Sequence, residues 1–170
     1  MFRLTTERLF LRHLQITDDE PMYRIFCDPQ VMRFSDGVKS REWVQGWLHA
    51  CLEHYRTWGF GPYAIAEQRN QVVIGYCGLF FFPDLDGQTE TEIGYRLACS
   101  TWGQGYATEA AKVVRDFAFE TLDIKRLIAM IDPSNVASIH VAEKIGMHYE
   151  KDVRLEGYDH PDHVYVIATS

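Results

Sequence analysis

Hydrophobic residues repeat along this chain with two different periods, and the two periods alternate. Apolar residues at every second position are typical of β-strands, whereas apolar residues three and four positions apart are typical of helices that bury one face. The first pattern predicts strands over 8–14, 62–67, 72–82, 89–97, 147–154 and 163–168, and the short apolar run over 126–131 predicts a further strand that is buried on both faces. The second predicts helices from 17 to about 27, between 40 and 59, from the glycine-rich stretch after 102 to about 121, and over 136–145.

Capping residues stand at several of these helix ends. Ser40 is a good N-cap for the second helix, since a serine hydroxyl can accept a bond from the first turn. Gly59 and Gly146 stand where helices should end, because glycine adopts the left-handed conformation of a C-cap. Residues 17–20 have the form of a capping box, and Pro21 follows in the first turn.

The predicted order is β-α-α-β-β-β-α-β-α-β-β, which indicates an α+β sandwich around one mixed sheet. A length of 170 residues suits one domain, 1–170. The strand–helix–strand unit around 89–131 should be a parallel crossover. Residues 83–88 are predicted to form a loop, and the last two strands a hairpin. Gly75 and Gly78 should leave room for something close to their strand.

The composition is that of a globular protein, with 46% hydrophobic and 24% charged residues. The four cysteines match neither a zinc site nor a redox pair and the histidines form no metal pattern, so we expect no metal and buried free thiols in a reducing cytoplasm. No apolar run is long enough for a bilayer, and the charged N-terminus is unlike a signal peptide. A net charge of −7 argues against general nucleic-acid binding and weakly favours a cationic acceptor.

The stretch 102–111, WGQGYATEAA, joins a predicted strand to a predicted helix. The N-terminus of a helix offers free N–H groups and the positive end of the helix dipole, which together favour an anion such as a phosphate. Gly103 and Gly105 remove the Cβ atoms that would keep a phosphate away from the backbone, and Ala107 is small. The spacing fits neither a P-loop nor the dinucleotide fingerprint. An ordinary glycine-rich turn is the alternative.

This stretch resembles the acyl-CoA pyrophosphate loop of the GNAT N-acetyltransferase superfamily, Arg/Gln-x-x-Gly-x-Gly/Ala. Gly105 and Ala107 match, whereas Trp102 departs from the first position. Residues 6–12 and 135–147 are similar, in the right order, to the opening strand and a later helix of the branch that acetylates ribosomal-protein N-termini and of its small-molecule relatives. The resemblance implies acetyl-CoA as cosubstrate, bound by Leu97, Gly103, Gln104, Gly105, Tyr106, Ala107, Thr108 and Asn135.

The resemblance also implies the fold, a mixed and mostly antiparallel twisted sheet flanked by helices. Two neighbouring parallel strands splay apart in this family, and the pantetheine arm of CoA fills the gap between them. The strand that leads into the 102–111 loop and the strand over 126–131 would form this pair.

Glu92 is the first candidate for the base that deprotonates an amine. It occupies a position that resembles a frequent family base, on the strand before the loop. Alternation puts Glu90, Glu92 and Arg96 on one face of that strand, so a surface ion pair between Glu92 and Arg96 is the alternative, and Glu90 is a second candidate base.

The remaining chemistry is implied by the family segments. The backbone near Leu97 would polarise the thioester carbonyl. Asn135 can bind the cosubstrate, cap its helix, or do both. Many relatives carry a tyrosine acid at the position of Ala142, so Ser138, a water molecule or unassisted release of the thiolate must replace it. Ser138 as a packing residue is the alternative. His140 stands where the family often has an arginine near the phosphates.

The resemblance therefore predicts a cytoplasmic N-acetyltransferase, monomeric or homodimeric, that transfers the acetyl group directly to a primary amine. The α-amine of a protein N-terminus is the first candidate acceptor, and a polyamine or aminoglycoside is the second. A CoA-binding module without activity, or a different phosphate binder, remains a further alternative. No nucleic-acid or membrane partner is expected.

Acceptor choice should depend on the residues between the first strand and the second helix and on the loop after Pro83. Phe34 or Trp43 could line an acceptor groove. Residues 160–163, His-Pro-Asp-His, are interpreted as a turn before the last strand, with Asp162 as a solvated charge.

Overall fold

The computed structural model describes every residue of the chain, 1–170, as one eight-stranded sheet with four α-helices. The strand order is β1-β2-β3-β4-β5-β6-β8-β7. The strands are β1 Leu4–Thr5, β2 Leu9–His13, β3 Pro62–Glu67, β4 Val73–Leu85, β5 Gln88–Leu97, β6 Arg126–Ile131, β7 His148–Val153 and β8 Asp162–Ala168. The helices are α1 Asp19–Phe26, α2 Arg41–Trp58, α3 Tyr106–Glu120 and α4 Val136–Lys144, with short 3-10 turns at Ile16–Asp18 and Cys99–Thr101. The predicted fold class is confirmed.

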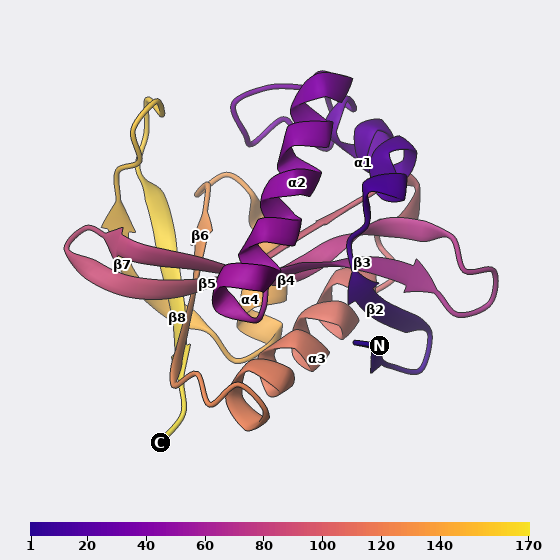
Figure 1. Ribbon diagram of the computed structural model, residues 1–170. Helices are drawn as coiled ribbons and strands as arrows, with labels where there is room; N and C mark the ends of the chain where they lie inside the picture. The colour runs from indigo at the N-terminus through magenta and orange to yellow at the C-terminus, as the bar shows by residue number, and fades with distance from the viewer.

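The helices cover both faces of the sheet, and each face carries its own core. Figure 1 shows α1 beside α2 near the top of the view, and α3 below them. Along β3, Tyr63 and Ile65 belong to the core beneath α3 and α4, whereas Ala64 belongs to the core beneath α1 and α2. This alternation is the period of two seen in the sequence. The α3–α4 core includes Leu11, Leu79, Ile93, Ala110, Val114 and Leu127, and the α1–α2 core includes Leu14, Met22, Val44, Leu48 and Tyr76.

Every strand pair is antiparallel except β5 with β6. That parallel pair is in register at one position, Glu92 opposite Ile128, although β5 continues to Leu97. The two strands therefore separate beyond Glu92, which agrees with the splay that the resemblance implied. In Figure 1, β6 and β8 run steeply while β4 and β5 run nearly across the view.

Gly75 and Gly78 do leave room for close neighbours, and those neighbours belong to the sheet itself. A Cβ on Gly75 would lie 2.2 Å from the carbonyl oxygen of Arg96 on β5, and one on Gly78 would lie 2.3 Å from that of Gly61 beside β3. Such distances are far inside van der Waals contact. The glycines thus allow β4 to sit tightly between its neighbours, where the twist of the sheet brings the backbones together.

The prediction of a loop over 83–88 was wrong, because β4 and β5 form one long hairpin. Its turn is Asp86-Gly87, with φ of 53° and 79°, the left-handed pair that suits a two-residue hairpin. Pro83 lies within β4, where the register shifts between Phe82 and Leu85, and such an irregularity accommodates a proline. The first strand, β1, was missed because two residues carry no period.

The caps predicted at Ser40, Gly59 and Gly146 are present, with Gly146 just after the end of α4 at a φ of 94°, whereas the predicted capping box is not. The Ser40 hydroxyl accepts a bond from the Trp43 N–H at 3.1 Å, and Gly59 ends α2 with a φ of 78°. The capping box over 17–20 is absent. Asp18 instead accepts from the Gln15 N–H and binds Arg12 through both carboxylate oxygens at 2.8 Å, so its side chain closes the preceding 3-10 turn.

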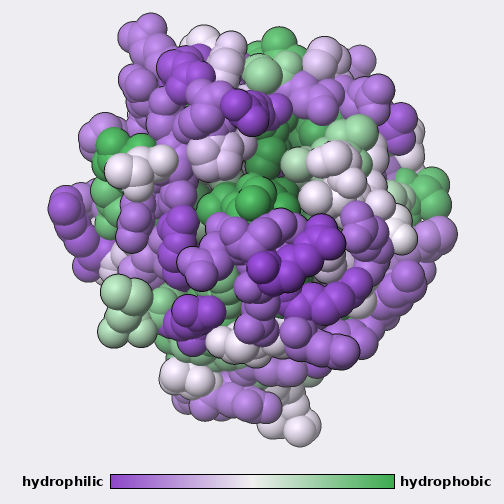
Figure 2. Space-filling model, turned by 90° about the vertical axis from the view of Figure 1, so that its right-hand side faces the viewer, coloured by the Kyte–Doolittle hydropathy of each residue, from purple (hydrophilic) through white to green (hydrophobic).

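The surface is mostly polar. Figure 2 shows one face on which hydrophilic residues surround a hollow where apolar side chains gather. None of the helices combines the length and the apolar content that a bilayer crossing requires. The four cysteines are free, as expected, but only Cys51 and Cys77 are buried, while Cys27 and Cys99 are half-buried.

Candidate active site

The N-terminus of α3 is free to bind an anion. Gly103 and Gly105 have φ of 73° and 80°, which a residue with a Cβ rarely adopts. Gly105 is the N-cap and offers no side-chain cap. The first bond of the helix runs from the Glu109 N–H to the Gly105 carbonyl at 3.0 Å. The N–H groups of Tyr106, Ala107 and Thr108 therefore have no partner within the helix and point outwards at its positive end.

Residues at the start of the chain hold this loop in place. Arg8 donates to the Gln104 carbonyl at 2.8 Å and to the Glu109 carboxylate at 2.7 Å, and Thr6 donates to the same carboxylate. Burial raises the pKa of Glu109, but these hydrogen bonds outweigh it and leave the pKa below its usual value. The opening segment and the glycine loop, matched separately in the sequence, thus form one unit.

The Tyr106 side chain anchors the loop to the rest of the protein and does not contribute to the exposed N-terminal surface of α3. Its hydroxyl donates to Glu67 at 2.8 Å, and its ring lies beneath the Arg8 guanidinium at 4.4 Å. The residue is buried. Only the backbone of Tyr106 is therefore available to a ligand.

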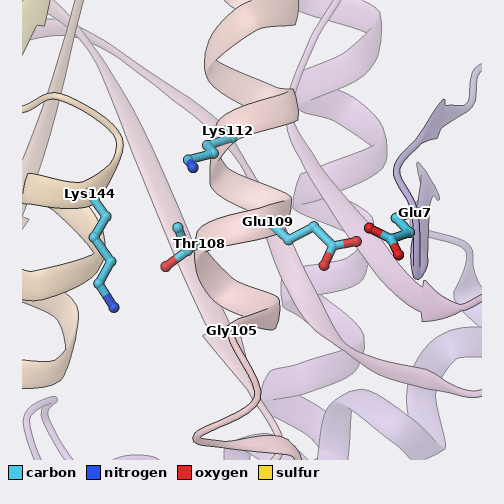
Figure 3. A pocket seen from close by; sticks show the side chains of 6 residues that line it. All are labelled: Glu7, Gly105, Thr108, Glu109, Lys112 and Lys144. Atoms are coloured by element: carbon cyan, nitrogen blue, oxygen red, sulfur yellow. The ribbon is translucent and has the colours of Figure 1, made fainter.

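A pocket of about 360 Å³ lies over this loop and between α3 and α4. In Figure 3, Thr108 and Lys112 of α3 and Lys144 of α4 point into the same space. Glu109 points the other way, towards Glu7 and the start of the chain. Two ammonium groups and the helix N-terminus thus converge, which favours a phosphate group. Lys144 lies one turn after His140 on α4.

Glu92 lies at the last position where β5 and β6 pair. Its Oε2 accepts a hydrogen bond from the backbone N–H of Met130 on β6 at 2.9 Å. Burial raises the pKa of Glu92 to about 7, and the charge of Asp162 adds to the increase while the Met130 bond opposes it. A carboxylate with such a pKa can take up a proton near neutral pH, which an ordinary surface carboxylate cannot do efficiently.

The alternative of a surface ion pair between Glu92 and Arg96 is wrong. Arg96 donates to the Ser35 hydroxyl at 2.9 Å and to the Met32 sulfur at 2.7 Å. Glu90, the second candidate base, is 5% exposed and forms an ion pair with Arg126 at 3.0 Å. Glu92 is therefore the carboxylate of this face that has no cationic partner.

The backbone of Leu97 faces the gap between the splayed strands. The Ala98 N–H donates to the Ile74 carbonyl on β4 at 2.8 Å. Successive strand residues direct their backbone groups to opposite sides, so those of Leu97 point away from β4 and towards the gap. The Trp102 indole donates to the Leu97 carbonyl at 3.0 Å. The Leu97 N–H is thus the group that can polarise a carbonyl, and Trp102 helps to hold it.

The first turn of α4 reaches back to β5. Asn135 is the N-cap, as one interpretation predicted, with its Oδ1 accepting from the Ser138 N–H at 3.2 Å. The Tyr95 hydroxyl donates to the Ser138 carbonyl at 2.7 Å, which ties α4 to β5 beyond the point where β5 pairs with β6. The Ser138 side chain is half-buried, and Ala142 is fully buried in the α3–α4 core.

A second cavity, of about 320 Å³, lies on the side of the sheet where Glu92 lies. It is lined by 33–36, which precede α2, by Asp132 after β6, and by 157–160 between β7 and β8. Phe34 lines this cavity and Trp43 does not. The interpretation of Asp162 as a solvated charge was wrong, because the first residue of β8 is only 9% exposed. Its pairing with Val153 of β7 carries it into the sheet.

Sequence reasoning missed several residues of these two regions. Arg8, Lys112 and Lys144 come from separate elements and meet only in the fold. A helical wheel of α3 could have found Lys112, since it follows Thr108 by one turn. Nothing in the sequence near Asp162 signals its burial.

The comparisons with known proteins agree with this geometry. The chain matches the family model of the acetyltransferase (GNAT) domain over residues 8–148. It is 36% identical to YkkB of Bacillus subtilis over 153 residues, which covers 89% of this chain and 88% of that protein. An acetyltransferase structure from Agrobacterium tumefaciens is similar with a TM-score of 0.86 and 30% identity, over 99% of this chain and 95% of that one.

A more distant likeness is to RimL, described as a ribosomal L7/L12 alpha-N-protein acetyltransferase in complex with coenzyme A. The TM-score is 0.80 at 18% identity, over 98% of both chains. At this identity the likeness concerns the fold.

Proposed function

The chain belongs to the GNAT acetyltransferase family and is an acetyl-CoA-dependent N-acetyltransferase, and on this premise we propose that it transfers the acetyl group directly to a primary amine with Glu92 as the general base. The observation that carries the proposal is the position of Glu92. It is a half-buried carboxylate without a cationic partner, with a pKa raised to about 7, at the point where β5 and β6 separate.

The residues at the α3 N-terminus fit the phosphates of acetyl-CoA. The backbone of Gly103, Gly105 and Ala107 lets a pyrophosphate approach without a clash, and Lys112 and Lys144 supply positive charge. Acetyl-CoA, when bound, supplies the activated acetyl group as a thioester. The full set of residues proposed to contact it is Leu97, Gly103, Gln104, Gly105, Tyr106, Ala107, Thr108 and Asn135, with the contact of Tyr106 through its backbone.

Glu92 takes the proton that the amine must lose. The amine nitrogen forms a bond to the acetyl carbon, the bond from that carbon to sulfur breaks, and the sulfur leaves with the electron pair. The Leu97 N–H stabilises the negative charge that develops on the carbonyl oxygen. Ser138, on the first turn of α4, relays a proton from water to the leaving sulfur, so that its hydroxyl is restored in the same step. A thiolate is a stable leaving group near neutral pH, so this last step contributes less than the first.

Two classes of acceptor are considered, a protein N-terminus and a small amine, and each is supported by a different observation. The resemblance implies the α-amine of a protein N-terminus. A small amine is favoured by the second cavity, because its volume of about 320 Å³ suits a small molecule. In both cases the reacting group is a primary amine next to Glu92.

The test is the release of CoA from acetyl-CoA in the presence of pooled amines, with the products separated by mass spectrometry. The pool holds peptides that begin with Ser, Ala and Thr, together with spermidine and an aminoglycoside. We expect one class of acetylated product, and its loss in Glu92→Gln. Binding of acetyl-CoA without any acetylated amine would contradict the proposal and favour a binding module.

A further inference from the structure

The connection between α1 and α2, residues 27–39, contains neither a helix nor a strand. Met32 is buried in the α1–α2 core, whereas residues 33–38 are half-buried or exposed. The backbone hydrogen bonds here are local, such as the one from the Ser35 N–H to the Met32 carbonyl at 3.0 Å. A segment with few buried contacts opens easily. The position of residues 33–38 therefore depends on side-chain contacts from outside the connection.

Arg96 of β5 supplies such contacts. Its guanidinium donates to the Ser35 hydroxyl at 2.9 Å and to the Met32 sulfur at 2.7 Å. The same group lies 5.3 Å from the centre of the ring of Phe26, the last residue of α1. The planar guanidinium has several donors with fixed directions, so one side chain can hold two residues of the connection at once. Arg96 itself is half-buried, which limits the positions that it can adopt.

The turn after β5 holds the same connection at a second place. The Cys99 thiol donates to the side-chain oxygen of Gln30 at 3.1 Å. Apart from the contacts of Arg96 and Cys99, no hydrogen bond joins residues 28–38 to the sheet. The connection is therefore attached to the end of β5, the strand that also carries Glu92.

The attached residues form one wall of the second cavity. Residues 33–36 line it, and they include both Ser35, which Arg96 holds, and Phe34. The Arg33 guanidinium stacks on the Phe34 ring at 4.5 Å, a contact within the wall itself. A wall that is already in place lowers the cost of binding, because its residues need not be ordered when a ligand enters.

We propose that Arg96 is a positioning residue, which holds residues 33–36 against the end of β5 and thereby sets the affinity for the acceptor amine. This inference rests on the proposed function, and it adds a residue that acts through the cavity wall. Arg96 takes no part in the proton transfers.

The first test is the steady-state kinetics of Arg96→Gln, with the member of the amine pool that is acetylated as the acceptor. The KM for the amine should rise about tenfold, because the loosened wall must be ordered on binding, while kcat and the KM for acetyl-CoA stay within about twofold. Removal of a positive charge would by itself lower the KM for a cationic amine, so the rise separates positioning from charge. Arg96→Lys should lie between the two, since an ammonium group lacks the planar set of donors.

Arg115→Gln is the matched control. Arg115 is also half-buried, and it donates to the Ile145 carbonyl at 2.7 Å and to Asp116 at 2.8 Å, but it lies on α3. Its loss should lower the stability of the fold without changing the KM for the amine. An unchanged or lowered amine KM in Arg96→Gln would overturn the positioning role and leave the acetyltransferase intact. A change of kcat or of the KM for acetyl-CoA as large as that of the amine KM would also overturn it.

A second measurement is independent of catalysis. Hydrogen–deuterium exchange of the amides of residues 30–36 should be faster in Arg96→Gln than in wild type, and unchanged in Arg115→Gln. Equal exchange in wild type and Arg96→Gln would overturn the proposal, whether or not an amine is acetylated. If exchange rises but no amine is acetylated, the proposed function fails and the role in affinity fails with it, while the attachment of the connection stands.

Should Arg96→Gln not fold, Ser35→Ala provides a second variant, which removes one of the two hydrogen bonds at a half-buried position. We then expect a rise of a few-fold in the KM for the amine, with faster exchange of residues 33–36. The absence of both effects would overturn the proposal.

Discussion

The two halves of the proposed site use different chemical groups, backbone N–H groups in one half and side chains in the other. At the α3 N-terminus the groups proposed to bind the ligand are mostly backbone N–H groups from consecutive residues, 103–108. At the proposed acceptor side the group is a side chain, the Glu92 carboxylate of β5, which the N–H of Met130 on β6 holds at 2.9 Å. Binding by backbone groups is altered by changes in backbone conformation or in steric access. The function of a side-chain group depends on its charge, so a single substitution can remove it.

Glu92→Gln should have the largest effect. A general base contributes roughly a hundredfold or more to the rate, so we expect kcat to fall by at least about 100-fold. The KM and the affinity for acetyl-CoA should change little, because Glu92 lies away from the α3 N-terminus. Steady-state kinetics with a separate binding measurement check this. Glu120→Gln, at the exposed end of α3, is the control, and an unchanged kcat in Glu92→Gln would remove Glu92 from the mechanism.

The pH dependence of kcat/KM should also distinguish the side-chain half of the site from the backbone half. Glu92 acts as a carboxylate, so kcat/KM should rise about tenfold per unit of pH up to a pKa of about 7 and level off above it. Glu92→Gln should lack this step. The binding of acetyl-CoA should not follow Glu92, since the backbone groups that bind it do not titrate.

The stability of the fold should change with pH in the opposite direction to kcat/KM, and should fall as the pH rises. The pKa of Glu92 in the folded chain is raised from 4.5 to about 7, so folding favours the protonated form. The contribution of Glu92 to stability is full at low pH and is lost as the pH rises through about 7. Urea unfolding at pH 5 and pH 8 should therefore find Glu92→Gln more stable than wild type only at the higher pH. Equal differences at both values would contradict the raised pKa.

Gly105→Ala should affect the backbone half alone. The alanine must adopt a φ of 80°, and its Cβ would stand where the phosphate is proposed to approach. We therefore expect the KM for acetyl-CoA to rise about tenfold with kcat nearly unchanged. Gly59→Ala is the matched control, because Gly59 has a φ of 78° with open space around it and lies at the end of α2. Both variants should lose about 1 kcal/mol of stability. A KM shift of the same size in both would mean that strain, and not access, is responsible.

Lys112→Ala and Lys144→Ala should have smaller effects. Each removes one exposed ammonium group from the pocket over α3, so the KM for acetyl-CoA should rise a few-fold at low salt and less at high salt. Lys125→Ala, whose ammonium pairs with Asp123 at a distant turn, should change nothing. Salt titrations of the KM for each variant measure this. An effect that persists at high salt would indicate a contact other than charge.

Ser138→Ala should have the smallest effect on turnover. The backbone bonds of Ser138 with Asn135 and Tyr95 persist in the variant, so only the hydroxyl is lost. If the hydroxyl protonates the leaving sulfur, kcat should fall a few-fold, with stability unchanged. An unaltered kcat would make Ser138 a packing residue.

The same contrast explains what the sequence could predict. The 103–108 loop could be identified as a candidate phosphate site because its residues are consecutive, and because repeated glycines allow a ligand to approach the backbone closely. Glu92 was predicted from its place on a strand and from the family resemblance, but its hydrogen bond with Met130 depends on the pairing of β5 with β6. Asp162 was misinterpreted because its sequence neighbours are polar, and only the pairing of β7 with β8 buries it. Pro83 suggested a loop, although a register shift accommodates it within β4.

The single register contact between β5 and β6 has a mechanical consequence. Strands β1 to β5 form one plate and β6, β8 and β7 form another, and the sheet hydrogen bonds hold them together only around Glu92 and Ile128. The bond from Met130 to the Glu92 carboxylate is a further link across the same line. Glu92 therefore lies on the line along which the two groups of strands meet. The gap that opens beyond Glu92 is the space proposed for the arm of acetyl-CoA.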